Sequence, residues 1–193
     1  MTAHRLYLAS ASPRRRQLLE QLGLSFEVQV PEVDETPRPG ELPTDYVLRL
    51  ARTKAESMAG KLGQPVARVL AADTAVVLGN VILGKPKGRE DALVMLARLS
   101  GRDHEVLSAV ALWHDGRVDM GLSRSEVRFR TIAAAEAAAY WDTGEPADKA
   151  GAYGIQGLGA VFVERLQGSY SGVMGLPLFE TVELLRRAGM SVF

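Results

Sequence analysis

Three consecutive arginines, Arg14 to Arg16, stand at the start of an expected helix, just after the small residues Ser10 and Ser12. The first turn of a helix exposes backbone N–H groups and carries a partial positive charge, so cations are disfavoured there unless an anion joins them. A phosphate held by arginine side chains at a helix N-terminus meets both conditions. The segment therefore predicts an anion site, and a solvated basic turn is the simpler alternative.

Two lysines could complete such a site. Lys54 shares one face of an expected helix with apolar residues such as Val47 and Leu50. Its ammonium group therefore either enters an enclosed polar site or reaches water past a packed stem. Lys85 lies in the segment GKP, where glycine permits a close approach of the backbone and proline fixes its direction. Lys85 fits a phosphate-binding lysine and an exposed loop lysine equally well.

Carboxylates supply the opposite charge. Asp73 follows the apolar run 69–72, where we expect a buried strand to end, and ligands of open α/β sheets bind beyond the carboxyl ends of strands. Asp73 could hold a metal or activate a water there, or it could cap a local turn. Glu32, Asp34 and Glu35 cluster in a long proline-rich loop, and with Asp73 they could bind a hard cation. A solvated acidic loop is the common alternative.

The stretch 148–157, DKAGAYGIQG, is dense in glycine. Glycine lets the backbone approach a ligand closely, and the amide of Gln156 can read a base through a paired donor and acceptor. A tight structural turn is the alternative. The stretch carries neither the P-loop pattern nor the dinucleotide-binding pattern. Cations, carboxylates and a glycine-rich loop together predict a nucleoside triphosphate substrate with a divalent ion, but they do not name the reaction.

The composition limits the classes of protein to consider. The 193 residues are 47% hydrophobic and 24% charged, which is ordinary for a globular chain long enough to bury a core. The 23 basic residues balance 23 acidic ones, which argues against a general nucleic-acid binder. Cysteine is absent, so disulfides and thiolate metal sites are excluded. We see no signal peptide and no apolar run of ~20 residues, and we expect a soluble cytoplasmic protein.

The elements that must position these residues follow from periodicity and turn signals. We expect strands at 6–9, 26–30, 69–72, 76–78, 81–83, 104–113, 117–130 and 161–165. We expect helices at 13–22, 44–61, 90–99, 133–141 and from Pro177 to about Gly189, and no regular element over 151–159. This order predicts an α/β fold in which helices flank a mixed, elongated central β-sheet, within a single domain over residues 1–193.

Seven motifs in order along the chain resemble those of the Maf family of nucleotide pyrophosphatases. They are S-x-S-P-R-R, EVDET, R-L-A-R-x-K-A, AADT, GKP, DKAGAYGIQG and GLPLFET. Each motif alone is weakly specific, but seven in sequence across nearly the whole chain are highly specific. The resemblance implies a Maf/ITPase-like fold with two lobes around a cleft.

Three positions resemble the dTTP/UTP pyrophosphatase branch of that family. Arg14, Thr74 and Gln156 stand where the sister branch, which acts on 7-methyl-GTP, tends to carry Trp, Gln and Glu. The resemblance implies cleavage of dTTP or UTP to the monophosphate and pyrophosphate, with Mg²⁺ or Mn²⁺ as the cofactor. It also implies a cytoplasmic homodimer with no membrane partner and no stable nucleic-acid partner.

The resemblance further implies a role for each residue. Asp73 is the general base or a metal-bound carboxylate, and Glu35 supports the metal or the water. Arg15, Lys54 and Lys85 hold the triphosphate, with Ser10 or Ser12 nearby, and Lys54 and Lys85 count with the catalytic group. Arg14, Thr74 and Gln156 select the base, and Arg16 has no assigned role.

The family also carries an older label as septum formation inhibitors. The alternative function is therefore a nucleotide- or nucleic-acid-binding regulator of cell division. Asp73 separates the two classes, because a pure binder gains nothing from a carboxylate beside phosphates, whereas a hydrolase needs one.

Overall fold

The computed structural model describes residues 5–63 and 67–192. The strands are β1 (Arg5–Ala9), β2 (Phe26–Gln29), β3 (Ala67–Leu78), β4 (Val81–Leu83), β5 (Asp103–His114), β6 (Arg117–Phe129) and β7 (Val163–Gln167). The helices are α1 (Pro13–Glu20), α2 (Pro43–Leu62), α3 (Arg89–Leu99), α4 (Ala134–Asp142), α5 (Tyr170–Met174) and α6 (Leu178–Arg187). Three short 3-10 segments are η1 (Glu145–Asp148), η2 (Ala150–Ala152) and η3 (Leu158–Phe162).

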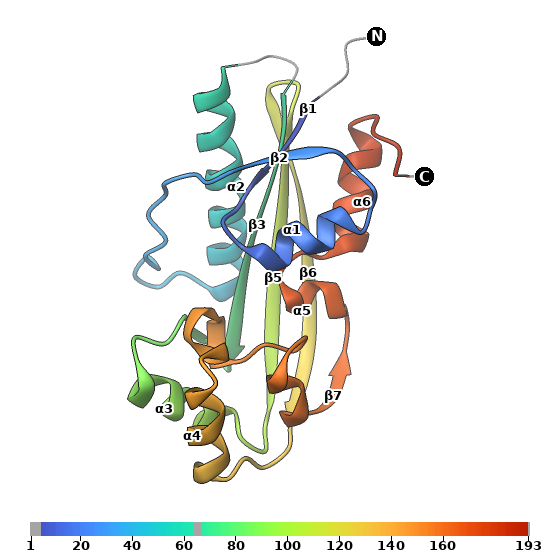
Figure 1. The fold of residues 1–193 in the computed structure, drawn as a ribbon. Coiled ribbons are helices and arrows are strands. Elements are labelled where there is room, and N and C mark those ends of the chain that lie inside the picture. The colour runs from blue at the N-terminus through green and yellow to red at the C-terminus, as the bar shows by residue number, and fades with distance from the viewer. Residues whose placement is uncertain (1–4, 64–66, 193) are drawn as a thin grey trace.

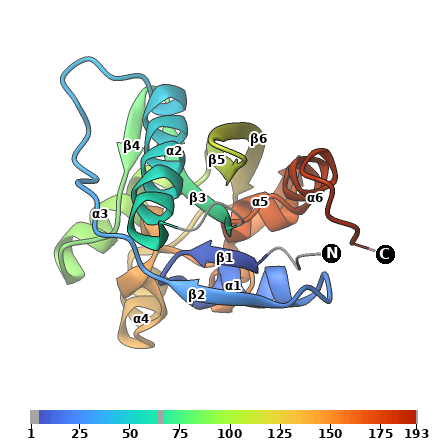
Figure 2. The same ribbon diagram turned by 90° about the horizontal axis from the view of Figure 1, so that it is seen from above.

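The strands form one seven-stranded sheet in the order β2-β1-β3-β5-β6-β7, with β4 paired to β3 outside this path. β1 pairs in parallel with β2 and β3, and the other pairs are antiparallel. Helix α2 covers one face of the sheet, and α1 and α6 pack on the other (Figures 1 and 2). The predicted α/β fold with a mixed sheet flanked by helices is confirmed, and its division into two lobes stays a prediction.

The strand containing Asp73 is longer than predicted. We expected strands at 69–72 and 76–78 with Asp73 after the first, but β3 runs through Asp73 and Thr74 without a break. Both residues keep their pairing with β5, opposite Ala109 and Ser108. Asp is uncommon within strands, so Asp73 suggested the end of the strand. Pairing with β5 overrides this low strand propensity here. The prediction that Asp73 follows the end of its own strand was wrong.

One edge of β3 is open around Asp73. β1 pairs with this edge up to Leu70, and β4 pairs with it again from Val76. Within residues 5–63 and 67–192, no strand pairs with that edge between these two points. Side chains alternate along a strand, so Asp73 faces α2 and Thr74 faces α1. The gap lies beyond the carboxyl end of β1. Ligands of open α/β sheets bind beyond such strand ends, so this expectation applies to β1 rather than to β3.

The C-terminal third differs from prediction in its boundaries. β7 begins at Val163 because the preceding residues form η3, and the last helix begins at Leu178 with Pro177 as its N-cap. Helix α5 was not predicted, since five residues give too short a periodic pattern. The expectation of no regular element over 151–159 is confirmed in essence, because only short 3-10 turns occur there.

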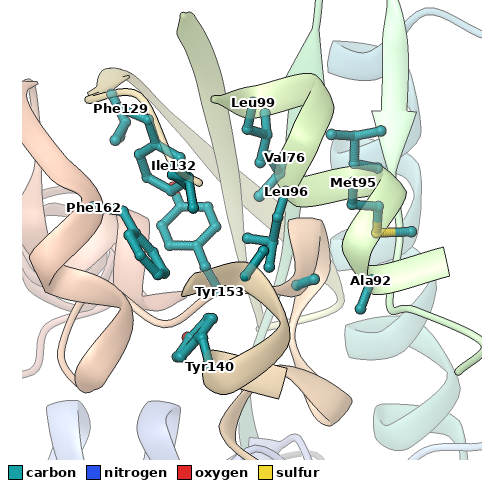
Figure 3. Close-up of a cluster of buried hydrophobic side chains, with 14 of the residues drawn as sticks. Val76, Ala92, Met95, Leu96, Leu99, Phe129, Ile132, Tyr140, Tyr153 and Phe162 are labelled. Atoms are coloured by element: carbon teal, nitrogen blue, oxygen red, sulfur yellow. The ribbon is translucent and has the colours of Figure 1, made fainter. Parts of the chain in front are cut away.

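A third hydrophobic cluster lies beside the ends of β5 and β6, away from α2 and α6. It joins α3, α4 and the 3-10 segments, with Phe129, Tyr140, Tyr153 and Phe162 packed among aliphatic side chains (Figure 3). The glycine-rich stretch therefore rests on a packed aromatic base. No helix in the described part of the chain is long and apolar enough to cross a membrane.

Candidate active site

A cavity of about 520 Å³ opens at the gap in the β3 edge. Its size is typical of a small-molecule site. All ten predicted site residues line it: Ser10, Ser12, Arg14, Arg15, Glu35, Lys54, Asp73, Thr74, Lys85 and Gln156. Arg16 instead forms an exposed ion pair with Glu20, with 2.8 Å between Nε and Oε1. The structure thus brings the predicted residues together around one cavity.

Lys54 joins two carboxylates inside this cavity. Its Nζ lies 2.7 Å from Oδ1 of Asp73 and 2.6 Å from Oε1 of Glu35. The side chains of Lys54 and Asp73 are 10% and 9% exposed, whereas that of Glu35 is 54% exposed. The alternative of a lysine that escapes to water is therefore wrong, because the ammonium group ends on buried Asp73.

The acidic loop contributes one carboxylate to the cavity. The hydroxyl of Tyr46, on α2, donates to the backbone carbonyl of Glu35 at 3.0 Å and holds the loop against the helix. Asp34 instead accepts from the backbone N–H of Thr36 at 2.9 Å, and it is exposed like Glu32. For Glu32 and Asp34, the solvated-loop alternative is correct.

The environments of Asp73 and Glu35 drive their pKa values in opposite directions. Burial raises the pKa of Asp73, and the positive charges of Lys54 and Arg15 oppose only part of that rise. Partial burial also tends to raise the pKa of Glu35, but the hydrogen bond from Lys54 and the positive charges of Lys54, Lys85 and Arg15 together leave that pKa lowered. Two carboxyl groups whose pKa values differ in this way can take different roles. Asp73 can act as the stronger base, and Glu35 can remain ionised.

Arg15 is held firmly on the opposite side of β3. Its Nε donates to the carbonyl of Gly175 at 2.7 Å, Nη1 to Oγ of Ser10 at 3.4 Å and Nη2 to Oγ1 of Thr74 at 3.3 Å. Ser12 is the N-cap of α1 and accepts from the backbone N–H of Arg15 at 3.5 Å. A guanidinium has five N–H groups, so two remain for an anion. Burial lowers the pKa of Arg15, as expected for a poorly solvated cation that an anionic ligand would stabilise.

Thr74 has a partner that the sequence did not indicate. Its hydroxyl lies 2.8 Å from Oγ of Ser108, which itself donates to the carbonyl of Gly172 at 2.6 Å. Ser108 has one proton, so the bond between the two hydroxyls uses the proton of Thr74. The only available signal was a serine within the apolar run of β5, and such a signal does not reveal its partner.

The remaining predicted residues, Arg14, Lys85 and Gln156, line other parts of the same cavity. Nη1 of Arg14 lies 3.1 Å from Oδ2 of Asp148, and Nζ of Lys149 lies 2.7 Å from Oδ1 of the same carboxylate. Lys85 and Gln156 are exposed to the cavity. Neither has a hydrogen-bond or ion-pair partner among the described residues, so their polar groups are available to a ligand.

The donor set of the cavity fits a divalent cation in a limited way. The described residues contain no cluster of three or more metal-ligating side chains. Asp73 and Glu35 do converge, however, and the Lys54 ammonium between them shows that the site accepts positive charge. Magnesium is often bound through one or two carboxylates, with substrate phosphates and waters as its other ligands. Two carboxylates are therefore a sufficient protein contribution.

The glycines of the stretch 148–157 and of its continuation contact protein atoms closely. A Cβ added at Gly151 would lie 2.8 Å from Cγ1 of Val76, and one added at Gly159 would lie 2.6 Å from the hydroxyl of Tyr140. A Cβ at Gly157 would collide with the carboxylate of Glu145. The tight structural turn, which was the alternative interpretation, accounts for these glycines.

Comparisons with known proteins find a matching family and similar sequences. The family described as Maf-like protein matches residues 5–188. A protein of Methylococcus capsulatus named dTTP/UTP pyrophosphatase is 57% identical, over 96% of this chain and 92% of its own length. A protein of Bordetella pertussis with the same name is 55% identical, over 97% of this chain and 94% of its own. The solved structure of the Staphylococcus aureus Ham1 protein covers 65% of this chain and 71% of its own, with a TM-score of 0.46 and 16% identity.

Proposed function

Because this chain belongs to the Maf family, we propose that it hydrolyses dTTP and UTP to the nucleoside monophosphate and pyrophosphate. The observation that carries the proposal is the buried pair of Asp73 and Lys54 with Glu35 beside it, in one cavity with Arg15 and Lys85. A carboxylate with a raised pKa beside cations suits the attack of water on a phosphate anhydride.

The residues divide the reaction among them. Attack of water at the α-phosphorus breaks its bond to the oxygen that bridges it to the β-phosphorus, and this leaves negative charge on pyrophosphate. Asp73 orients the water and takes its proton, and Lys54 fixes the orientation of Asp73 through the 2.7 Å bond. Arg15 and Lys85 bind the phosphates and stabilise the developing charge. Ser10 and Ser12 shape the turn that places Arg15.

Asp73 and Glu35 would together hold Mg²⁺ or Mn²⁺ in this proposal. When bound, such an ion supplies neutralisation of the triphosphate charge and acidification of a water. Exposed Glu35 can move toward an ion more readily than buried Asp73, which the strand fixes. The proposal also includes a cytoplasmic homodimer that has no stable nucleic-acid partner.

A panel of triphosphates tests the proposed function. With Mg²⁺ or Mn²⁺, we expect pyrophosphate release from dTTP and UTP to exceed release from CTP, GTP and 7-methyl-GTP by at least about tenfold in kcat/KM, as for a site that reads polar base edges. The monophosphate should appear in equal amount with pyrophosphate. A preference for 7-methyl-GTP would contradict the assignment to the pyrimidine branch, and release of single phosphates would contradict the reaction.

Gln156→Glu is expected to weaken the pyrimidine preference. The change replaces an amide donor with a carboxylate at a position exposed to the cavity, so a base carbonyl loses its donor. We expect the ratio of kcat/KM for dTTP to that for CTP to fall by about tenfold, the value of one hydrogen bond whose loss leaves a polar group unpaired. Ratios equal to those of the wild type across dTTP, UTP, CTP and GTP would remove Gln156 from base selection.

A further inference from the structure

Gln156 lies on a three-residue segment, residues 155–157, that is anchored at one end by Tyr140 and at the other end by Glu145. On its N-terminal side, the backbone N–H of Gly154 donates to the hydroxyl of Tyr140 at 3.1 Å. On its C-terminal side, the N–H groups of Leu158 and Gly159 donate to the two carboxylate oxygens of Glu145 at 2.8 and 3.0 Å. The hydroxyl of Tyr140 donates in turn to Glu145 at 2.7 Å and closes the arrangement.

We propose that Glu145 and Tyr140 are positioning residues for base selection, which clamp residues 154–159 and so fix the place of Gln156 in the cavity. The inference rests on the proposed function, because it names how that same site selects its base. Neither residue touches the substrate in this proposal. Both act through the backbone of residues 154–159, which we call the clamped segment.

The protonation states of the clamp are well defined. Burial tends to raise the pKa of Glu145, but hydrogen bonds from Gly159, Tyr140 and Leu158, together with the charge of Lys149, leave that pKa lowered. Burial and the neighbouring Glu145 carboxylate raise the pKa of Tyr140, so its hydroxyl keeps its proton. Glu145 is therefore an acceptor at both oxygens, and Tyr140 donates to it while accepting from Gly154.

Close packing makes the clamp rigid. A Cβ at Gly159 would lie 2.6 Å from the Tyr140 hydroxyl, and one at Gly157 would collide with Glu145, so only glycine lets the segment close around the pair. The ring of Tyr140 packs edge-on against Phe162, with centroids 5.1 Å apart, within the aromatic cluster of Figure 3. The clamp is thus built on the hydrophobic core rather than on a free loop.

The position of Gln156 depends on this backbone. Its side chain is exposed to the cavity and bonds to no other described residue. The backbone of the clamped segment therefore sets where its amide meets a base. Hydrogen-bond readout requires placement within a few tenths of an ångström, so release of either anchor should reduce discrimination between bases more than it reduces the chemical step.

Glu145→Gln and Tyr140→Phe test the clamp, with Glu136→Gln as the matched control. Glutamine at 145 turns one acceptor into an NH₂ group that faces a backbone N–H, and phenylalanine at 140 keeps the ring but removes the hydroxyl. Glu136 also accepts from a backbone N–H, that of Ala133 at 3.2 Å, but it lies outside the cavity. We expect the dTTP to CTP ratio of kcat/KM to fall about tenfold in both clamp variants, mainly through KM for dTTP, and to stay unchanged in the control.

Amide hydrogen exchange gives a measure that does not depend on turnover. Peptides covering residues 150–162 should exchange faster in both clamp variants than in the wild type and the control. Unchanged exchange would overturn the clamp, whatever the substrate of the enzyme. Faster exchange with an unchanged base ratio would overturn the positioning of Gln156. If the wild type released no pyrophosphate from dTTP or UTP, the proposed function would fail, and the exchange data would still decide the clamp.

A double-mutant cycle with Gln156→Ala tests whether Glu145 affects base selection through Gln156. If Glu145 acts on selection through Gln156, then Glu145→Gln should change the base ratio in the wild type and leave it unchanged in the Gln156→Ala background. An equal effect in both backgrounds would show that the clamp acts on another group and would overturn the assignment.

Discussion

Asp73→Asn is expected to abolish measurable pyrophosphate release from dTTP and UTP, with kcat lowered about 10³-fold or more, as for the loss of a general base. Asparagine has the same shape and keeps an oxygen for the 2.7 Å bond from Lys54. It cannot take a proton, and it carries no charge for a cation. Since β3 continues to pair through this position, the fold should survive.

The measurement is a single-turnover assay with a separate determination of dTTP binding. Binding within a few-fold of the wild type and loss of turnover would assign Asp73 to the chemical step. Asp34→Asn is the matched control, because Asp34 lies in the exposed loop beside Thr36 and outside the cavity. Full activity of Asp73→Asn would remove Asp73 from the mechanism. A wild type that binds dTTP without turnover would favour the regulator of cell division instead.

Helical periodicity and motif order located the cavity lining well. The position of Lys54 on the apolar face of its helix follows from the spacing of Val47 and Leu50, and in the structure its side chain is 10% exposed. The resemblance to a family then connected Lys54 with Asp73 and Gln156, which lie far apart in the sequence. All ten predicted residues line one cavity because the motifs mark the segments that fold around it.

The contacts that fix these residues could not be predicted, because their partners carry no signal in the sequence. Arg15 is held by the backbone carbonyl of Gly175, 160 residues away, and every residue type has such a carbonyl. Ser108 supports Thr74 through strand pairing whose register is set by the whole sheet. Glycine density predicted a close approach of the backbone to a ligand, whereas Gly157 and Gly159 lie close to the side chains of Glu145 and Tyr140.

The topology explains why one site can use both faces of the sheet. Alternation on β3 sends Asp73 toward α2 and Thr74 toward α1, and a continuous sheet would keep the two apart. The gap between β1 and β4 connects the two sides at this point. The group around Arg15, which we propose to bind phosphate, and the carboxylate group around Lys54 can therefore act on one ligand.

Lys54→Met is expected to lower kcat/KM by at least about 10²-fold, because Asp73 loses its orientation and the phosphates lose a nearby charge. Methionine fills a similar volume, so the packing of α2 should be kept. Burial already raises the pKa of Asp73, and the charge of Lys54 opposes that rise. Without the lysine, the pKa of Asp73 rises further. The reaction needs the carboxylate, so the acid limb of the pH–rate profile should move to higher pH.

The same change should alter the pH dependence of stability. A carboxyl group whose pKa is higher in the folded state than in the unfolded state binds more protons when folded. Its contribution to the free energy of unfolding is therefore present at low pH and is lost as pH rises through the folded-state pKa. Lys54→Met removes a partner from buried Asp73. Relative to the wild type, the variant should therefore lose more free energy of unfolding at about pH 8 than at about pH 5.

Urea unfolding at several pH values and the pH–rate profile measure both effects on one variant. Lys61→Met is the control, because Lys61 is exposed near the end of the same helix. An acid limb at the wild-type pH in Lys54→Met would show that Lys54 does not tune Asp73, even if activity fell. If Lys54→Met lowered the free energy of unfolding equally at every pH, the loss of stability would come from packing. If the pH–rate profile and the pH dependence of unfolding both change in Lys54→Met, then both report the protonation of Asp73. Only that result would show that the buried ion pair controls the carboxylate that reacts.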